Sequence, residues 1–338
     1  MKLSILDQSP IGTGQSPAQA LRNTVELAEL ADQLGYTRYW VAEHHAMHSH
    51  GGSAPEVLVA AIAARTGRIR VGSGGVLLSH YSPFKVAEVF RTLEALYPGR
   101  IDLGIGRSAG SSPIESYALR GTRGTAQAVS SGDDFDDKLV ELLAFLDGSF
   151  PAGHPFHDVV VTPTGAGRPD VWLLGSSPRS GAVAAQLGLP YAYAHFINPA
   201  PTRAVFADHR ARTGGTGTAI LGIGVYCADT EAEAERVYAT QRAFRRRLTR
   251  NDVRPVPSPE QSLLELADGD DPLGAERFEF PRYVYGTPSR VRDQILAITE
   301  ATGAEEVIAL ATIYDHADRL RSYELLAQAF ALQPVAAV

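Results

Sequence analysis

The chain has 338 residues, of which 44% are hydrophobic and 20% are charged, and its formal net charge at pH 7 is -7. This length allows one large hydrophobic core, and the negative charge gives no general attraction for nucleic acid or for anionic membranes, so we expect neither as a partner. The single cysteine, Cys227, excludes an internal disulfide, and the chain opens on a strand-like run with no leader pattern, so we expect a cytoplasmic protein.

Short strand-like runs alternate with longer amphipathic segments almost to the end of the chain, and eight such units can be counted. The first helix is predicted to begin after Ser16 and Pro17, a good cap and first-turn pair, and to end near Gly35. Its apolar residues recur at helical spacing and predict one buried face. The predicted strands cover residues 3–6, 39–41, 69–78, 101–105, 171–174, 191–194, 219–227 and 307–311.

This alternation predicts an α/β protein, a single (β/α)8 TIM barrel domain over residues 1–338. An open doubly wound sheet would alternate in the same way, but the count of eight and the lack of a good dinucleotide fingerprint favour the barrel. Three long segments, residues 107–131, 148–170 and 251–281, interrupt the repeat and predict loop insertions at the carboxyl-terminal face. We expect the third, which is polar and rich in proline and aspartate, to pack loosely and act as a mobile lid.

A histidine pair directly follows the second predicted strand, in the segment Ala42-Glu43-His44-His45. Active sites of (β/α)8 barrels lie at the carboxyl ends of the strands, so this position indicates a functional site. An imidazole titrates near neutrality, and His44 or His45 could therefore act alone as an acid or a base. The alternative is a pair of surface or hydrogen-bonded histidines.

The same loop also contains His48 and His50, which raises the possibility of a metal site. Barrel metal sites draw ligands from several strand ends, and the nearest candidates elsewhere are Asp7 and His195. Because no clear ligand set emerges, we expect no metal. His48 and His50 lie between glycines and serines, and we expect both to face the solvent.

Two later strand ends suggest anion binding. Arg107 follows the fourth strand among small residues, which suits a phosphate, although a structural arginine is the alternative. The glycine spacing around it is off by one for a dinucleotide turn. Ser176 and Ser177 follow the fifth strand and lead into a helix, so their hydroxyls and the free N–H groups form a potential anion site. Simple capping of the helix by serine is the alternative.

Several of these segments together resemble the bacterial luciferase-like family of flavin-dependent monooxygenases. The similarity runs essentially end to end and is carried by residues 6–10 (LDQSP), 39–45 (YWVAEHH), 71–76 (VGSGGV), 98–107 (PGRIDLGIGR) and 285–288 (YGTP). The resemblance implies a (β/α)8 barrel that binds FMN at the carboxyl ends of its strands.

The resemblance also implies roles for individual residues. His44 matches the family's catalytic histidine, with His45 as the next candidate, and Arg107 matches an arginine that binds the flavin phosphate. Further residues implied as cofactor contacts are Ser176 and Ser177, at the phosphate, and Gly74 and Gly75, which occupy the place of a non-prolyl cis peptide behind the flavin ring. Gly106 stands where the light-emitting luciferase subunit has a reactive cysteine, so light emission is not implied.

The activity implied by the resemblance is a monooxygenase reaction. It would use FMN reduced by a separate flavin reductase, together with molecular oxygen, to oxygenate a small hydrophobic substrate such as an aldehyde or a polyketide intermediate. We further expect a homodimer. Aromatic residues near predicted strand ends could contact the substrate or belong to the core; they are Tyr81, Phe84, Tyr117, Phe196 and Tyr314. The alternatives are a deazaflavin-dependent hydride-transfer enzyme, a non-catalytic flavin-binding protein and a metal-dependent barrel hydrolase.

Overall fold

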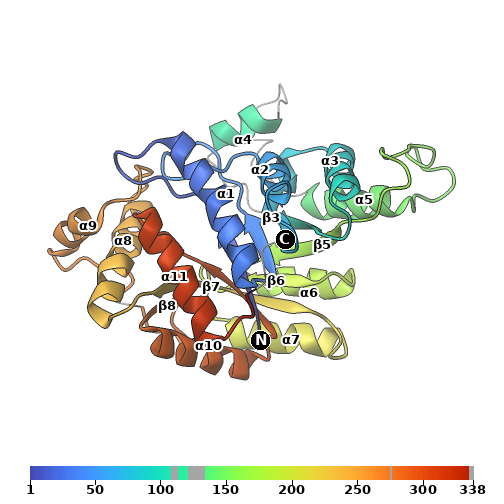
Figure 1. Ribbon diagram of the computed structural model, residues 1–338. Helices are drawn as coiled ribbons and strands as arrows, with labels where there is room; N and C mark the ends of the chain where they lie inside the picture. Colours follow the sequence, from blue (N-terminus) through green and yellow to red (C-terminus); the bar gives the residue numbers. More distant parts are fainter. Residues whose placement is uncertain (108–112, 121–133, 275, 335–338) are drawn as a thin grey trace.

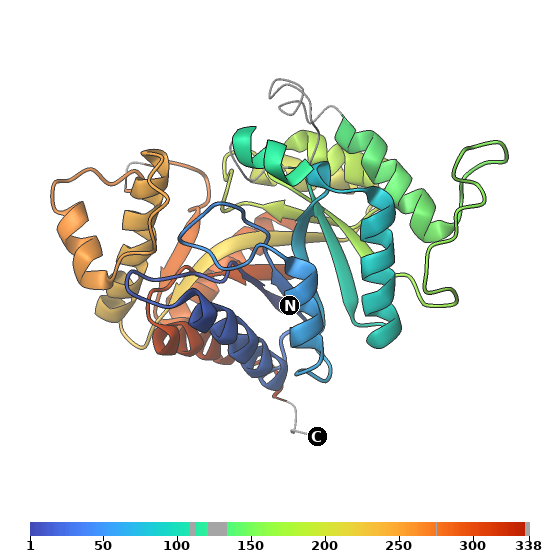
Figure 2. The ribbon, with the colours of Figure 1, turned by 90° about the horizontal axis from the view of Figure 1, so that it is seen from above.

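The computed structural model describes residues 1–107, 113–120, 134–274 and 276–334. Its strands form one closed parallel barrel surrounded by helices (Figures 1 and 2), as the sequence predicts. Each strand pairs with the next from β1 to β7, and β9 closes the ring between β7 and β1. The strands are β1 (Lys2–Asp7), β2 (Arg38–Val41), β3 (Arg70–Leu77), β4 (Ile101–Gly106), β5 (Asp170–Gly175), β6 (Tyr191–Ala194), β7 (Ala219–Cys227), β8 (Tyr283–Gly286) and β9 (Glu306–Leu310).

The sequence analysis missed β8, which pairs with the carboxyl-terminal half of β7 from Gly224 to Cys227. The eight predicted strands correspond to β1 to β7 and β9. The four residues of β8 follow the polar insertion at residues 251–281, and the sequence analysis assigns no separate strand and helix unit to them.

Helices cover the outside of the barrel (Figure 1). The first, α1, begins at Pro17 and ends at Leu34, and Gly35 follows in the left-handed conformation with φ of 87°, which confirms the predicted boundaries. The described helices are α1 (Pro17–Leu34), α2 (Pro55–Ala63), the 3-10 helix η1 (Leu78–His80), α3 (Pro83–Leu96), α4 (Pro113–Arg120), α5 (Phe135–Asp147), α6 (Pro178–Gln186), α7 (Thr202–Arg212), α8 (Glu231–Thr249), α9 (Pro259–Leu266), α10 (Pro288–Thr302) and α11 (His316–Ala329). Within the described part of the chain, no helix is long and apolar enough to cross a membrane.

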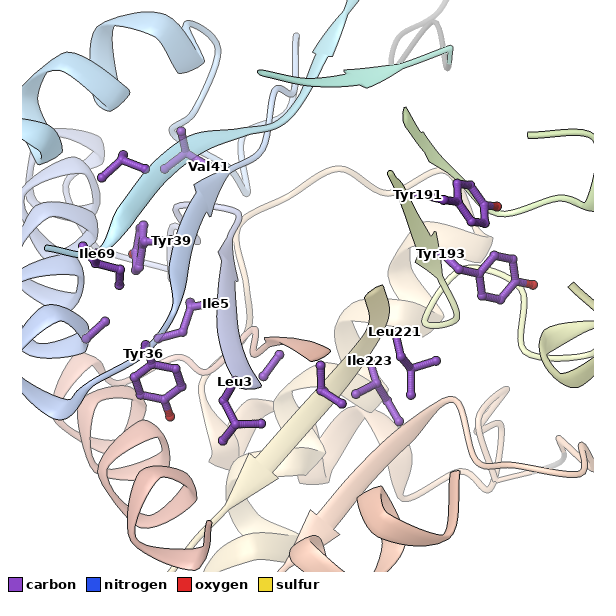
Figure 3. Close-up of a cluster of buried hydrophobic side chains, with 14 of the residues drawn as sticks. Leu3, Ile5, Tyr36, Tyr39, Val41, Ile69, Tyr191, Tyr193, Leu221 and Ile223 are labelled. Atoms are coloured by element: carbon purple, nitrogen blue, oxygen red, sulfur yellow. The ribbon is translucent and has the colours of Figure 1, made fainter. Parts of the chain in front are cut away.

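Alternate strand residues face opposite sides of the barrel wall. Leu3, Ile5 and Tyr39 belong to the large hydrophobic cluster that includes residues of the surrounding helices (Figure 3). Their neighbours Leu6 and Trp40 belong to a second, smaller cluster made of strand residues and Ala42. The outer cluster holds the helices on the barrel, and the inner one forms a floor below the carboxyl ends of the strands.

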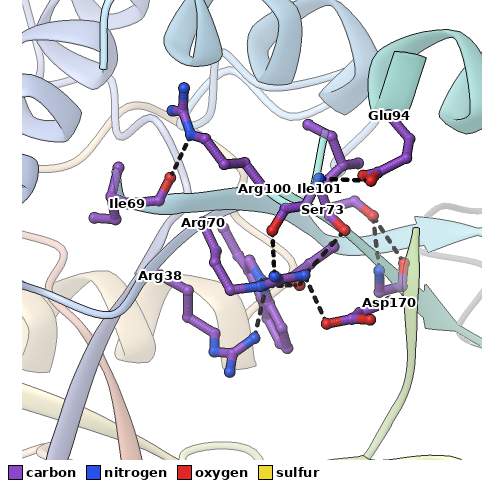
Figure 4. A network of polar contacts seen from close by, with 12 residues as sticks. Arg38, Ile69, Arg70, Ser73, Glu94, Arg100, Ile101 and Asp170 are labelled. Atoms are coloured by element: carbon purple, nitrogen blue, oxygen red, sulfur yellow. Dashed lines mark hydrogen bonds and ion pairs between the residues drawn. The ribbon is translucent and has the colours of Figure 1, made fainter. Parts of the chain in front are cut away.

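A buried network of charges occupies the barrel at the amino-terminal ends of the strands (Figure 4). Asp102 of β4 has no exposed side-chain area and accepts from Arg38 at 2.8 Å and from Arg70 at 2.7 Å. Arg38 also pairs with Glu306 at 2.6 Å, and Trp40 donates its indole N–H to Asp102 at 2.8 Å. The network therefore fixes Trp40, which belongs to the apolar floor.

The polar insertion at residues 251–281 contains structure that we did not anticipate. Its helix α9 begins with a capping box formed by Ser258 and Gln261. Glu265 pairs with Arg247 of α8, and Asp271 pairs with Arg242 of α8 at 2.7 Å. The sequence analysis expects this segment to pack loosely, whereas arginines of α8 bind its acidic residues. The lid role of this segment stays a prediction. Most of the other insertion, residues 107–131, lies outside the described residues.

Two glycines of β4 provide a matched test of close strand packing. A Cβ on Gly104 would lie 2.1 Å from the carbonyl oxygen of Ser73, whereas a Cβ on Gly106 would meet nothing closer than Leu77 Cδ2 at 3.6 Å. We expect Gly104→Ala to lower the free energy of unfolding by about 1–3 kcal/mol or more, because backbone must shift. Gly106→Ala should change it little. Urea unfolding of both variants checks this, and equal losses would contradict it.

Candidate active site

One cavity of about 450 Å³ opens at the carboxyl ends of the strands, a volume within the range of about 300–1,000 Å³ typical of small-molecule sites. Residues from successive strand ends line it, as expected for this fold. The predicted site residues that the structure brings together in its wall are His44, Gly74, Gly75, Arg107, Ser176 and Ser177. His45 does not belong to the described lining.

His44 lies at the cavity wall, and its backbone N–H donates a hydrogen bond to the carbonyl oxygen of Gly52 at 2.8 Å. Its Nδ1 is buried and has no hydrogen-bond partner among the described residues. Burial, and secondarily the neighbouring His45, lowers the pKa of His44 to about 4. His44 is therefore neutral at pH 7 and can accept a proton from a bound molecule.

His45 turns away from the cavity and contacts Glu43, with its Nε2 2.7 Å from the Oε1 of that carboxylate. Tyr81 donates its hydroxyl to the same oxygen at 2.6 Å, and the N–H of Leu77 donates to Oε2 at 3.0 Å. Burial, followed by the hydrogen bond to Glu43, raises the pKa of Tyr81. Glu43 is buried and lines the cavity, so its contact with His45 connects that histidine to the site.

Glu43 is thus a candidate functional residue that the sequence analysis passed over. It lies within the segment that we singled out, yet a sequence does not show which of four consecutive loop residues faces a cavity.

The expectation that His48 and His50 both face the solvent is wrong for His50. His48 is exposed, whereas only 8% of the surface of His50 is exposed. The centroid of the His50 ring lies 4.5 Å from that of the His44 ring and 5.6 Å from that of the Phe244 ring. Burial lowers the pKa of His50 well below its usual value. An aromatic side chain from α8 therefore covers this part of the loop, and His50 supports the ring of His44 from behind.

The two residues that we considered as further metal ligands have other partners. Asp7 accepts from Tyr39 at 2.5 Å and pairs with Arg319 at 3.1 Å. His195 is fully buried and contacts Thr202 at 2.6 Å and the carbonyl oxygen of Pro281 at 2.8 Å. Among the described residues, no group of three histidine, cysteine or acidic side chains is placed to hold a metal ion.

Cationic and hydroxyl groups line the cavity after the neighbouring strands β4 and β5. Arg107 lies there after β4, and Ser176 and Ser177 precede α6, whose first N–H groups are free of helical partners. Ser177 also caps α6 in a capping box with Ser180, so both predicted roles of this serine are compatible. Arg179, which the sequence analysis did not name as a site residue, lines the cavity as well. It pairs with Asp136 at 2.5 Å. This set of donors suits a phosphate.

The wall at Gly74 and Gly75 is shaped differently. The bond between them is cis, as the resemblance implies. A Cβ on Gly74 would lie 2.5 Å from Leu6 Cδ1, and one on Gly75 would lie 2.7 Å from the carbonyl oxygen of Gly104. Neither position has room for a side chain, and apolar residues such as Trp40 and Ile308 also line the cavity. An apolar wall together with donors that suit a phosphate fits a molecule such as FMN, which has a flat ring and a phosphate.

Of the five aromatic residues proposed for the substrate, Phe196 lines the cavity. Tyr81 bonds to Glu43, Phe84 packs 5.1 Å from Phe145, and Tyr314 donates to the carbonyl oxygen of Thr13 at 2.9 Å. Together with Tyr117, these three are absent from the described lining of the cavity.

The amino-acid sequence is similar to those of known proteins. A family model described as luciferase-like monooxygenase matches residues 1–306. The uncharacterized protein YceB of Bacillus subtilis is 40% identical over 97% of this chain and 99% of its own length. An N-acetyl-S-alkylcysteine monooxygenase of the same organism is 35% identical over 97% of this chain and 98% of its own.

Solved structures with the same fold include apo-MsnO8, with a TM-score of 0.90 and 51% identity over 99% of both chains. The oxygenating constituent of 3,6-diketocamphane monooxygenase from Pseudomonas putida, in complex with FMN, has a TM-score of 0.72 and 22% identity over 97% of both chains. An F420-dependent secondary alcohol dehydrogenase has a TM-score of 0.68 and 15% identity over 98% of this chain and 94% of its own. Because these last two are below 25% identity, they show likeness of fold alone.

Proposed function

Because the chain belongs to the luciferase-like monooxygenase family, we propose that it uses reduced FMN and molecular oxygen to oxygenate a small hydrophobic organic substrate. The observation that carries the proposal is the combination, in one cavity, of the neutral imidazole of His44, the side-chain-free wall at Gly74 and Gly75, and the phosphate-binding end at Arg107. Binding of FMN through these residues accounts for all three features.

In this proposal Arg107, Ser176 and Ser177 hold the phosphate, and the apolar wall at Gly74 and Gly75 contacts the ring. Reduced FMN, when bound, supplies the electrons for the reduction of oxygen. His44, which lines the cavity, accepts or returns a proton through its imidazole ring. The apolar residues around the ring limit the access of water, which favours transfer of oxygen to the substrate over release of hydrogen peroxide.

The second candidate is hydride transfer with a deazaflavin, because the fold is shared with an F420-dependent dehydrogenase. Anaerobic titration with reduced FMN, and in parallel with reduced deazaflavin, followed by a pulse of oxygen distinguishes the two. We expect tight binding of reduced FMN and its rapid oxidation after the pulse. Preference for the deazaflavin, without consumption of oxygen, would support the dehydrogenase. Binding of FMN without any faster consumption of oxygen in the presence of a reductase would indicate a flavin-binding protein.

Three accompanying features belong to the same proposal. A separate flavin reductase supplies reduced FMN, two copies of the chain form a homodimer, and residues 251–281 act as a lid. The described lining of the cavity includes no residue of that segment. To act as a lid, residues 251–281 would therefore have to move over the cavity or act on it through residues that contact both.

Replacement of Arg107 by alanine tests the phosphate end. We expect Arg107→Ala to weaken FMN binding by about 1.5–3 kcal/mol, the usual contribution of a hydrogen bond to a charged group, and to leave riboflavin binding almost unchanged. Calorimetric titration with both ligands measures the difference. Equal losses for FMN and riboflavin would show that Arg107 supports the fold or the ring and not the phosphate.

A further inference from the structure

The loop that follows β6 forms one wall of the cavity through Phe196 and Ile197. Phe196 is partly buried, whereas Ile197 is 52% exposed despite its apolar side chain. Asn198 continues this wall toward α6, because its side-chain amide donates to the carbonyl oxygen of Ser176 at 3.0 Å. The position of these residues therefore decides the shape of the cavity beside the phosphate-binding end.

A buried arginine from a distant part of the chain holds this wall. Arg282 donates through Nη1 to the carbonyl oxygens of Phe196, at 3.0 Å, and Ile197, at 2.5 Å. Only 8% of its side chain is exposed. His195 reaches the same segment, with its Nε2 2.8 Å from the carbonyl oxygen of Pro281. Pro281 and Arg282, which directly precede β8, thus contact consecutive residues of the loop after β6.

The other side of Arg282 faces the insertion. Its Nε lies 2.9 Å and 2.8 Å from the two carboxylate oxygens of Glu276, and its Nη2 lies 2.6 Å from Oε1. A guanidinium has five donors in a fixed plane, so it can hold a carboxylate and two carbonyl groups at once. Since Glu276 belongs to the 251–281 insertion, the side chain of Arg282 links that insertion to the cavity wall, in addition to the contact between His195 and Pro281.

We propose that Arg282 is a positioning residue that sets the Phe196–Ile197 wall of the cavity and couples it to the 251–281 insertion through Glu276. Movement of the insertion displaces Glu276 and with it the plane of the guanidinium, which shifts the two carbonyl groups. Conversely, a molecule that fixes the wall fixes the end of the insertion. This inference rests on the proposed function only for the choice of FMN as the probe.

Hydrogen exchange of the full-length protein, with and without FMN, tests the coupling. In the ligand-free protein, Arg282→Gln should speed exchange of the amides of residues 195–198 by about ten- to a hundredfold, because the wall loses hydrogen bonds from a charged donor. In the wild type, FMN should slow exchange at residues 195–198 and at 276–281. In Arg282→Gln, protection by FMN should remain at 195–198 and be lost at 276–281.

Three further variants complete the experiment. Arg277 is exposed, and its hydrogen-bond acceptors among the described residues are the backbone carbonyls of Gly274 and Glu276, so Arg277→Gln is the matched control and should behave as wild type. Glu276→Gln leaves the donors to the wall in place and should remove only the spread of protection to 276–281. Arg282→Lys retains the charge and should restore part of the slow exchange at 195–198.

The possible results separate this inference from the proposed function. If FMN protects residues 195–198 but the protection at 276–281 survives both Arg282→Gln and Glu276→Gln, the coupling is refuted. Unchanged exchange at 195–198 in ligand-free Arg282→Gln would likewise refute the positioning role. If FMN protects no part of the wild-type cavity, the proposed function fails, while the ligand-free comparison still decides the role of Arg282.

Discussion

Replacement of His44 by alanine should reduce product formation about a hundredfold or more and leave FMN binding near the wild-type value. His44 lines the cavity, and loss of a positioned acid–base group costs roughly 10²–10⁴ in rate. The proposed phosphate and ring contacts at Arg107 and Gly75 do not involve this histidine. Consumption of oxygen should therefore continue, with hydrogen peroxide as the main product.

The neighbouring histidines supply the controls. His48 is exposed in the same loop, and His48→Ala should retain wild-type coupling of oxygen consumption to product. His45 contacts Glu43 and not the cavity, so His45→Ala should have an intermediate effect. Simultaneous measurement of oxygen, peroxide and product checks all three variants. Full coupling in His44→Ala would assign proton transfer to another group, of which Glu43 is the next candidate.

The low pKa of His44 also predicts a pH dependence. Its pKa of about 4 in the folded protein lies below the usual 6.5, so it stays neutral and able to accept a proton at pH 5. Between these two values the unfolded chain binds more protons than the folded one. The stability linked to His44 is therefore complete above about pH 6.5 and is lost as the pH falls toward 4. Urea unfolding of wild type and His44→Ala across this range measures the difference.

Loss of Asp102 should be among the most destabilising single changes, at about 3–5 kcal/mol of unfolding free energy, because it removes the buried carboxylate that two arginines share. Asp102 has no exposed side-chain area and binds Arg38 and Arg70. Its removal in Asp102→Ala also frees the indole N–H of Trp40. Urea unfolding followed by circular dichroism measures the loss.

A surface pair provides the contrast. Asp208 and Arg212 lie 2.6 Å apart with side chains 43% and 53% exposed, so Asp208→Ala should cost less than about 1 kcal/mol. Asp102→Asn retains the shape of the side chain and should lose less stability than Asp102→Ala, which keeps the comparison possible if the alanine variant does not fold. Similar small losses for Asp102→Ala and Asp208→Ala would show that the network is dispensable.

The sequence by itself determined the architecture and much of the candidate site. Strand and helix periodicities are local properties, and their alternation predicted the barrel that the structure confirms. Once parallel strands form a barrel, their carboxyl ends meet at one face whatever the loops do. Residues at those ends, such as His44, Arg107 and Ser176, could therefore be expected to share one cavity before any contact was known.

Only the tertiary structure decided which way the loop side chains point and which distant residues hold them. His45 faces Glu43 and not the cavity, and His50 is buried because Phe244 of α8 covers it. Arg282 reaches the wall at Phe196 across 86 residues of sequence. Such contacts depend on how loops pack over the finished barrel, and loops have no periodicity from which their packing could be read.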